Sequence, residues 1–180
     1  VPMLAGIVRD DVETFRGAVF NHLVQADAFV SSGGVSVGER DVVKAAFSGR
    51  GDVEFFRVAM QPGMPQGFGH VEGKPYFGLP GNPVSVFVTF ELFVRPALRA
   101  LAGLAGTGRL RVRARLASAQ EKPRDLEVYL RVRLGRVRGD LVAEPLRTQA
   151  SGNLTSAAGH DALAVLPDLV TKWEAGLERI

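Results

Sequence analysis

The sequence contains no cysteine and only three histidines among its 180 residues. Without cysteine there can be no disulfide bridge, thiolate nucleophile, cysteine-bound zinc or iron–sulfur cluster. The histidines, His22, His70 and His160, show no ligand spacing and do not indicate a metal site. Any catalysis must therefore use oxygen, nitrogen and backbone groups.

Long hydrophobic runs are also missing. No charge-free apolar stretch approaches the ~18 to 20 residues that a membrane span requires, and no basic segment followed by an apolar run opens the chain. The composition, with 46% hydrophobic and 23% charged residues, is too apolar for a disordered chain. These features predict a soluble cytoplasmic protein of one domain or two small ones, with no membrane partner.

Charge is distributed unevenly along the chain. Residues 1–105 hold 9 Lys and Arg against 10 Asp and Glu, whereas residues 106–180 hold 13 against 9. The change coincides with three glycines in six residues, between Gly103 and Gly108, which is typical of a linker. We therefore expect one domain over residues 1–104 and a second over residues 105–180.

The first part alternates apolar strand-like runs with helical patterns, which predicts an α/β domain. Asp11 is the expected N-cap of the first helix, and Pro83 is expected in the first turn of the last. We expect helices over residues 12–24, 39–47 and 83–101, and strands over residues 26–31, 53–60 and 74–79. The strand at residues 26–31 is expected to be buried.

The second part changes to a period of two residues, which predicts a mostly β domain. Arginines alternate with apolar residues over residues 109–116 and again over residues 128–137. Arg138, Gly139 and Asp140 predict a hairpin turn that leads into a strand over residues 141–145. The arginines are expected on a solvated face. The expected core residues opposite them are Leu110, Val112, Ala114, Leu116, Leu130, Val132 and Leu134. Because no aromatic residues are interleaved, the basic stripe does not predict a nucleic-acid partner.

Three loops follow predicted strands of the first part: SSGGVSVGERD (residues 31–41), QPGMP (61–65) and GLPGNPVS (78–85). Ligands of open α/β sheets bind beyond the carboxyl ends of strands, where such loops meet. Glycines in the first loop allow close approach of the backbone to an anion, although a simple turn explains them equally well. Helix capping would account for Asn82 and Pro83, and a strand exit would account for QPGMP.

Two carboxylates neighbour these loops. Asp11 provides the expected helix cap, so Asp10 is not needed for capping. Asp41 lies in the first turn of a predicted helix, where an acid is common without any function. Taken together, they would suit Mg²⁺, which takes oxygen ligands and completes its shell with water and substrate phosphate.

The motifs SSGGVSVGERD, VAMQPGMPQGFG, GLPGNPVSV and QASGNLTSAAGHDALAVLP together resemble the C-terminal part of the molybdopterin molybdenumtransferase family, which includes a domain of gephyrin. The resemblance implies a three-layer molybdopterin-binding-like α/β domain over residues 1–104 and a small, mostly β, barrel-like domain over residues 105–180. It implies a Mg²⁺-dependent transferase of molybdenum cofactor biosynthesis, which inserts molybdate into adenylated molybdopterin and releases AMP. It also implies a homodimer and a partnership with the adenylyltransferase of the same pathway.

The resemblance assigns roles to particular residues. Asp10 and Asp41 would be catalytic and would hold Mg²⁺ beside the adenylate phosphoanhydride. The residues implied to bind phosphate, pterin or molybdate are Ser32, Gly33, Gly34, Ser36, Gly38, Pro62, Pro80, Gly81, Asn82, Pro83, Ser85 and Ser151, with Ser156 beside them.

The chain also departs from the family pattern. Gln61 and Met64 stand where family members often have lysine, which makes Arg57 a candidate for the positive charge that an oxyanion needs. The basic motif around Arg124 matches only loosely. Family members are about twice as long, so we expect this chain to be a C-terminal fragment. Two alternatives stay open, a molybdopterin adenylyltransferase-like or nucleotide-hydrolase-like enzyme and a non-catalytic scaffold module.

Overall fold

The computed structural model describes residues 1–35, 39–123, 125–167 and 172–173, which form two compact units. The first unit comprises Val1–Val58 and Pro65–Gly81, and the second comprises Ala59–Met64 and Asn82–Ile180. Within the described residues, every helix is too short or too polar to cross a bilayer.

The first unit is built on a four-stranded sheet with the order β1-β5-β4-β2. Strand β1 pairs in parallel with β5, whereas β4 runs antiparallel to both β5 and β2. The elements of this unit are α1 (Val12–Phe20), β1 (Phe29–Ser32), α2 (Glu39–Phe47), β2 (Gly51–Arg57), β4 (Pro65–Val71) and β5 (Lys74–Leu79).

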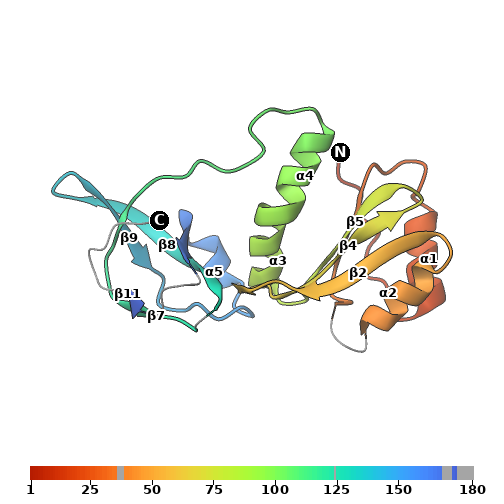
Figure 1. The fold of residues 1–180 in the computed structure, drawn as a ribbon, viewed down its shortest axis with the longest axis horizontal. Coiled ribbons are helices and arrows are strands. Elements are labelled where there is room, and N and C mark those ends of the chain that lie inside the picture. Colours follow the sequence, from red (N-terminus) through yellow and green to blue (C-terminus); the bar gives the residue numbers. More distant parts are fainter. Residues whose placement is uncertain (36–38, 124, 168–171, 174–180) are drawn as a thin grey trace. The chain divides into compact units, whose positions relative to one another are not determined.

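Helices α1 and α2 lie side by side against one face of this sheet (Figure 1). Their contact is aromatic, because the Phe47 ring lies 5.6 Å from the ring of Phe15 and 5.0 Å from that of Tyr76. Val71 and Val43 are buried in the same cluster. The amphipathic pattern of the two helices is therefore satisfied by one shared core.

Strand β4 was not expected from the sequence, because two glycines lower its strand propensity. Both glycines are required by close packing. A Cβ at Gly69 would lie 1.8 Å from the backbone oxygen of Asp52, and one at Gly67 would lie 2.9 Å from the ring of Phe55. Here glycine permits a close approach of backbones rather than a turn.

Three expectations for this unit need correction. The helix expected over residues 12–24 ends at Phe20 and continues only as turns. The strand expected over residues 26–31 begins at Phe29, and it is half exposed because it pairs with β5 alone. The strand expected over residues 53–60 ends at Arg57, and Met60 pairs instead with a strand of the second unit. The predicted ranges 39–47 and 74–79 are confirmed.

The second unit contains the long helix expected over residues 83–101, which is confirmed. It consists of α3 (Pro83–Thr89), a π-helical turn η1 (Phe90–Val94) and α4 (Arg95–Leu101). Pro96 lies two residues after the end of the π turn. Because proline lacks an N–H and its ring crowds the carbonyl four residues earlier, a widened turn accommodates it.

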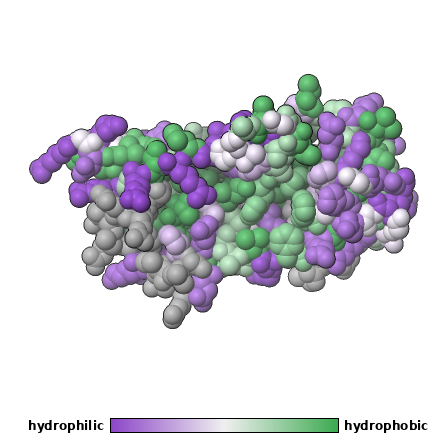
Figure 2. Space-filling model, turned by 45° about the horizontal axis from the view of Figure 1, so that its top comes forward, coloured by the Kyte–Doolittle hydropathy of each residue, from purple (hydrophilic) through white to green (hydrophobic). Residues whose placement is uncertain are grey.

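The rest of the second unit is a curled sheet with the order β10-β8-β9-β6, to which β3 adds beside β8. The predicted hairpin is confirmed, with Arg138 and Gly139 at positive φ in its turn, whereas Asp140, also expected in the turn, is paired with Val137. Hydrophilic side chains gather at its exposed tip (Figure 2). The elements are β3 (Met60–Gln61), β6 (Arg115–Leu116), β7 (Gln120–Glu121), β8 (Glu127–Val137), β9 (Asp140–Pro145), α5 (Thr155–Ala158), β10 (Ala162–Leu166) and β11 (Lys172–Trp173).

The core of this sheet is aliphatic, and part of it was expected. Ala114, Leu116, Leu130 and Val132 are buried in it as predicted, and Leu134 packs against it. Together with the mixed α/β first unit, the curled sheet confirms the expected fold class, an α/β part followed by a mostly β part.

Three expectations for the second unit are wrong. Only Arg115 and Leu116 of the segment 109–116 form a strand, because only these two residues have a backbone partner, in β9. Leu110 is 91% exposed and Val112 41% exposed, so neither belongs to the core. Arg131, expected on a solvated face, is 1% exposed.

Candidate functional site

The first predicted loop and the start of the third lie together in the first unit. Strands β1 and β5 are parallel, and their register pairs Ser32 with Leu79 at their carboxyl ends. The N–H of Gly33 donates to the oxygen of Leu79 at 3.0 Å, and a Cβ at Gly81 would lie 3.8 Å from the Cα of Gly33. Parallel pairing thus brings Gly33, Pro80 and Gly81 to one edge of the sheet.

The backbone of this edge requires glycine. Gly33 and Gly34 have φ values of +84° and +74°, a left-handed conformation that L side chains rarely adopt. Nearby, the side chain of Ser31 is hydrogen-bonded to the hydroxyl of Tyr76 at 2.6 Å, and burial raises the pKa of Tyr76 to about 12. Ser31 is therefore engaged within the fold, whereas Ser32 is exposed.

The two predicted carboxylates differ in what the structure describes of them. Asp11 caps α1 by accepting from the N–H of Thr14 at 2.9 Å. Asp10 is exposed and takes no part in that cap. Asp41 lies in the first turn of α2, but its side chain is outside the described part, as are Ser36 and Gly38. The described residues contain no group of three or more potential metal ligands.

In the second unit, the start of α3 meets the loop that contains Ser151. The N–H of Val84 donates to the backbone oxygen of Ser151 at 3.0 Å, and the amide nitrogen of Asn82 donates to Ser151 Oγ at 3.3 Å. Asn82 occupies the N-cap position but makes no side-chain cap, which corrects the capping interpretation. The carbonyl of Ser151 satisfies a free N–H of the first turn instead.

The other predicted site residues vary in exposure. Pro62, Pro80 and Ser85 are buried, whereas Asn82 and Pro83 are exposed. The backbone oxygen of Ser85 accepts from the hydroxyl of Thr89 at 2.8 Å. The side chain of Ser156 lies outside the described part.

One functional candidate was missed, the buried guanidinium of Arg131 in β8. Its Nη2 donates to the backbone oxygen of Thr148 at 3.4 Å, and its Nε has no hydrogen-bond partner among the described residues. No carboxylate of the described chain pairs with it, and burial alone lowers the pKa of Arg131. A buried cation without an acidic partner is costly in a monomeric fold.

Sequence patterns gave little warning of this residue. Arg131 alternates with Leu130 and Val132 as a solvated residue would, yet it is buried, and its guanidinium meets the backbone oxygen of the distant Thr148. The usable signal was the absence of lysine at Gln61 and Met64, which left the positive charge for an oxyanion to be supplied from elsewhere in the chain.

The other cations considered from the sequence have different environments. Arg57 is exposed at the end of β2, an edge strand separated from β5 by β4. Lys122 is buried and donates to the backbone oxygens of Pro123 and Leu126. Arg124 lies outside the described residues.

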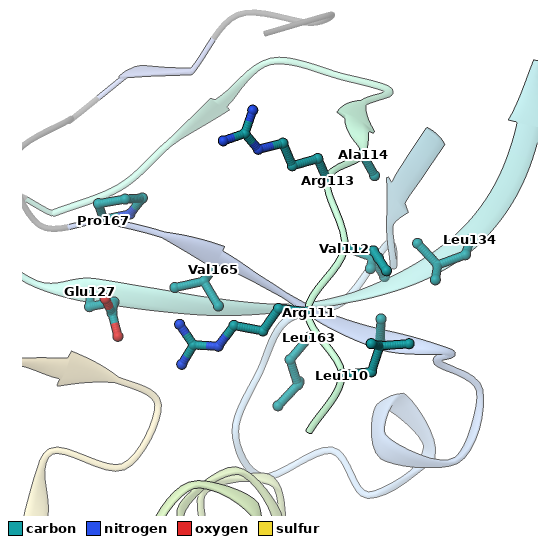
Figure 3. A pocket seen from close by; sticks show the side chains of 12 residues that line it. Leu110, Arg111, Val112, Arg113, Ala114, Glu127, Leu134, Leu163, Val165 and Pro167 are labelled. Atoms are coloured by element: carbon teal, nitrogen blue, oxygen red, sulfur yellow. The ribbon is translucent and has the colours of Figure 1, made fainter. Parts of the chain in front are cut away.

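The second unit also has a groove of about 350 Å³ where residues 110–114 cross β8 and β10 (Figure 3). Leu163, Val165 and Pro167 contribute apolar side chains, and the side chain of Arg111 extends in the direction of Glu127. The hydroxyl of Tyr129 donates to that carboxylate. Leu110 and Val112 also line this groove, which explains their exposure. None of the predicted site residues lines it.

Comparison with known families agrees with the resemblance seen in the sequence. Residues 3–100 match the family described as "probable molybdopterin binding domain", and residues 113–178 match the "MoeA C-terminal region (domain IV)". The chain belongs to the MoeA-type molybdopterin-binding family.

Individual relatives support this membership. The chain is 40% identical over 175 residues to molybdopterin molybdenumtransferase 2 of Mycobacterium tuberculosis and 31% identical over 176 residues to the molybdopterin molybdenumtransferase of Bacillus subtilis. These alignments cover 94% and 97% of this chain but only 43% and 41% of those proteins. A MoeA protein of Pyrococcus horikosii has a similar fold, with a TM-score of 0.77, 31% identity, and coverage of 97% of this chain and 41% of that chain.

Proposed function

We propose that this chain provides the molybdopterin-binding part of a molybdopterin molybdenumtransferase that acts in molybdenum cofactor biosynthesis. The proposed reaction inserts molybdate into adenylated molybdopterin and releases AMP. Family membership supports the pterin substrate, and the names of the relatives support the transfer. The same resemblance supports a cytoplasmic homodimer that receives its substrate from an adenylyltransferase.

The observation that carries this proposal is the buried guanidinium of Arg131. Molybdate and the substrate phosphates are oxyanions, and the planar fork of a guanidinium matches them. A buried cation attracts an oxyanion more strongly than an exposed one, because water screens it less. We infer that Arg131 supplies the positive charge that Gln61 and Met64 do not provide.

The loops at the strand ends supply the remaining proposed contacts. Gly33 and Gly34 permit a phosphate or pterin to approach the backbone closely, and Ser32 offers an exposed hydroxyl. In the second unit, the proposed binding residues are Asn82 and Ser151, which are hydrogen-bonded to each other. The side chains of Ser32, Asn82 and Ser151 are neutral hydrogen-bonding groups, which can bind the polar edge of a pterin and add to the charge of Arg131 at an oxyanion.

Mg²⁺ is the proposed cofactor, and Asp10 and Asp41 are the proposed ligands. Asp10 fits this role because its carboxylate is exposed and takes no part in the cap of α1. Mg²⁺ usually binds through one or two carboxylates together with water and substrate phosphate. Its chemistry here would be to neutralise the phosphoanhydride that is cleaved.

Adjacent aspartates provide a matched test. We expect Asp10→Asn to abolish the Mg²⁺-dependent part of adenylated molybdopterin binding and AMP release, with the thermal unfolding midpoint unchanged. Asp11→Ala should lower that midpoint, because it removes the side-chain cap of α1, while the Mg²⁺ dependence stays. Calorimetric titration with and without Mg²⁺ measures binding, and chromatography detects the release of AMP. Thermal unfolding gives the midpoint of each variant. Equal Mg²⁺ dependence in the two variants would exclude Asp10 as a ligand, and a wild-type chain that binds no pterin would refute the function.

A further inference from the structure

We propose that Gln149 is a positioning residue, which holds Arg131 and the loop of Ser151 in place for a bound oxyanion. The proposal rests on the proposed function, because Arg131 is the group through which Gln149 acts. The class of ligand is a tetrahedral oxyanion, either molybdate or a phosphate of the adenylated substrate.

The side chain of Gln149 takes the place of a strand residue beside Arg131. Its Oε1 accepts from the N–H of Arg131 at 3.0 Å, and its Nε2 donates to the backbone oxygen of Arg131 at 3.0 Å. These two bonds close the ring that a hydrogen-bonded residue pair makes in an antiparallel ladder. The carboxamide therefore continues the sheet where the backbone of β9 does not.

No other neighbour can replace this contact. Strand β9 ends at Pro145, and beyond it the N–H of Leu146 reaches only the oxygen of Arg131, at 3.0 Å. On the other side, Leu163 of β10 lies opposite Arg131, but in an antiparallel ladder both polar groups of a residue point to the same neighbour. Without Gln149, the N–H of Arg131 would lose its partner within the sheet.

The same short segment reaches the start of the long helix. Thr148, directly before Gln149, accepts from the guanidinium of Arg131, and Ser151, two residues after it, accepts from the N–H of Val84. Gln149 thus fixes the residue that carries the buried charge and the loop that carries the serine. A shift of either would change the distance between two groups proposed to bind one anion.

Gln149 acts through its neighbours and does not itself contact the ligand in this proposal. Both hydrogens of its amide are used, one by the oxygen of Arg131 and the other by that of Leu146 at 3.1 Å. No donor remains to bind an anion. Its effect on affinity must therefore come from the placement of Arg131.

The test compares Gln149→Leu with Gln120→Leu in the full chain. Gln120 also donates to a nearby backbone oxygen, that of Ala119 at 2.9 Å, but it has no contact with Arg131. Dissociation constants for sodium molybdate, inorganic phosphate and AMP are measured separately by calorimetry, which distinguishes the two sources of oxyanion. Amide hydrogen exchange at Arg131 and Val84 reports the positioning directly.

We expect Gln149→Leu to weaken binding of at least one oxyanion about tenfold, equivalent to about 1.4 kcal/mol, and to speed exchange at Arg131 and Val84. Gln120→Leu should leave both unchanged.

Loss of stability with unchanged affinity in the folded fraction would reduce Gln149 to a structural role and overturn the proposal. If Gln149→Leu does not fold, Gln149→Asn, whose shorter amide cannot span the gap, must show the same loss. A wild-type chain that binds none of the three anions would instead refute the anion site and this proposal with it.

Discussion

Two segments of this protein share one pattern, alternating arginine and apolar residues, yet they give their arginines opposite surroundings. In the first, residues 109–115, the Arg109 side chain is 65% exposed and donates twice to Glu91, at 2.7 and 2.8 Å. In the second, within β8, Arg131 is 1% exposed and pairs with no carboxylate of the described chain. Alternation therefore decides which residues share a face, but not which face water reaches.

Residues 105–109, at the start of the first segment and just before it, are held to the long helix by side chains. Arg95 donates to the backbone oxygen of Thr107 at 3.2 Å, and Arg99 donates to those of Gly106 and Ala105. With the Arg109–Glu91 pair, these bonds run along the glycine-rich residues that the sequence indicated as a linker. The linker is thus fastened at several points to one helix.

The largest effect is expected where the two segments differ most, at the buried cation. Arg131→Met keeps the length of the side chain and removes an unpaired buried charge, so the free energy of unfolding should rise by about 1 kcal/mol or more. Binding of molybdate and phosphate should be lost at the same time. Urea unfolding and calorimetric titration measure the two effects. A fall in stability of similar size would show that the guanidinium is satisfied within the fold.

The same substitution at the exposed arginine should act in the opposite direction. Arg109→Met removes a bidentate pair with Glu91, but water screens an exposed partner, so we expect a loss of about 1 kcal/mol or less. The loss should shrink in high salt, and oxyanion binding should not change. Urea unfolding at low and high salt provides the measurement. If Arg109→Met lowered the free energy of unfolding by more than the loss of a buried ion pair does, the contrast between the exposed and the buried arginine would be contradicted.

The exposed pair of Arg109 and Glu91 should also make stability depend on pH. The hydrogen bonds from Arg109 hold the pKa of Glu91 below its ordinary value of 4.5. A lowered folded pKa contributes stability that is complete above the unfolded pKa and is lost as the pH falls through the folded one. The difference in unfolding free energy between the wild type and Glu91→Gln should therefore be constant near neutral pH and decline below pH 4.5. Thermal unfolding across that range tests it, and a difference that grows on acidification would contradict it.

The smallest effect concerns polyanions. Exposed arginines should bind DNA or RNA only weakly, with an affinity that falls steeply with salt through counterion release. Arg113→Ala, at an exposed position, should reduce the salt slope by about one, whereas Arg131→Met should leave it unchanged. Filter binding at several salt concentrations measures the slope. Sequence-selective binding that persists at ~200 mM salt would favour a binding module instead.

Sequence periodicity predicted the elements whose partners are adjacent in the chain. The helix bounds at residues 39–47 and 83–101 and the hairpin at Arg138 and Gly139 agree with the structure, because local spacing, proline and turn residues fix them. Strand β4 escaped detection because glycines that serve close packing also weaken the strand pattern. The site residues lying together in each unit, Gly33 with Gly81 and Asn82 with Ser151, are compatible with the predicted loops. Their roles stay predictions.

The sequence by itself determined the family, the fold class and the loops on which a site could be sought, because these depend on motifs and on periodicity along the chain. Tertiary structure alone decided the burial of Arg131, the replacement of the Asn82 cap by the carbonyl of Ser151, and the ladder position that Gln149 fills. Each of these depends on contacts between residues 17 to 67 positions apart. Burial and hydrogen bonding are properties of what covers a residue, and no local pattern specifies which distant segment that will be.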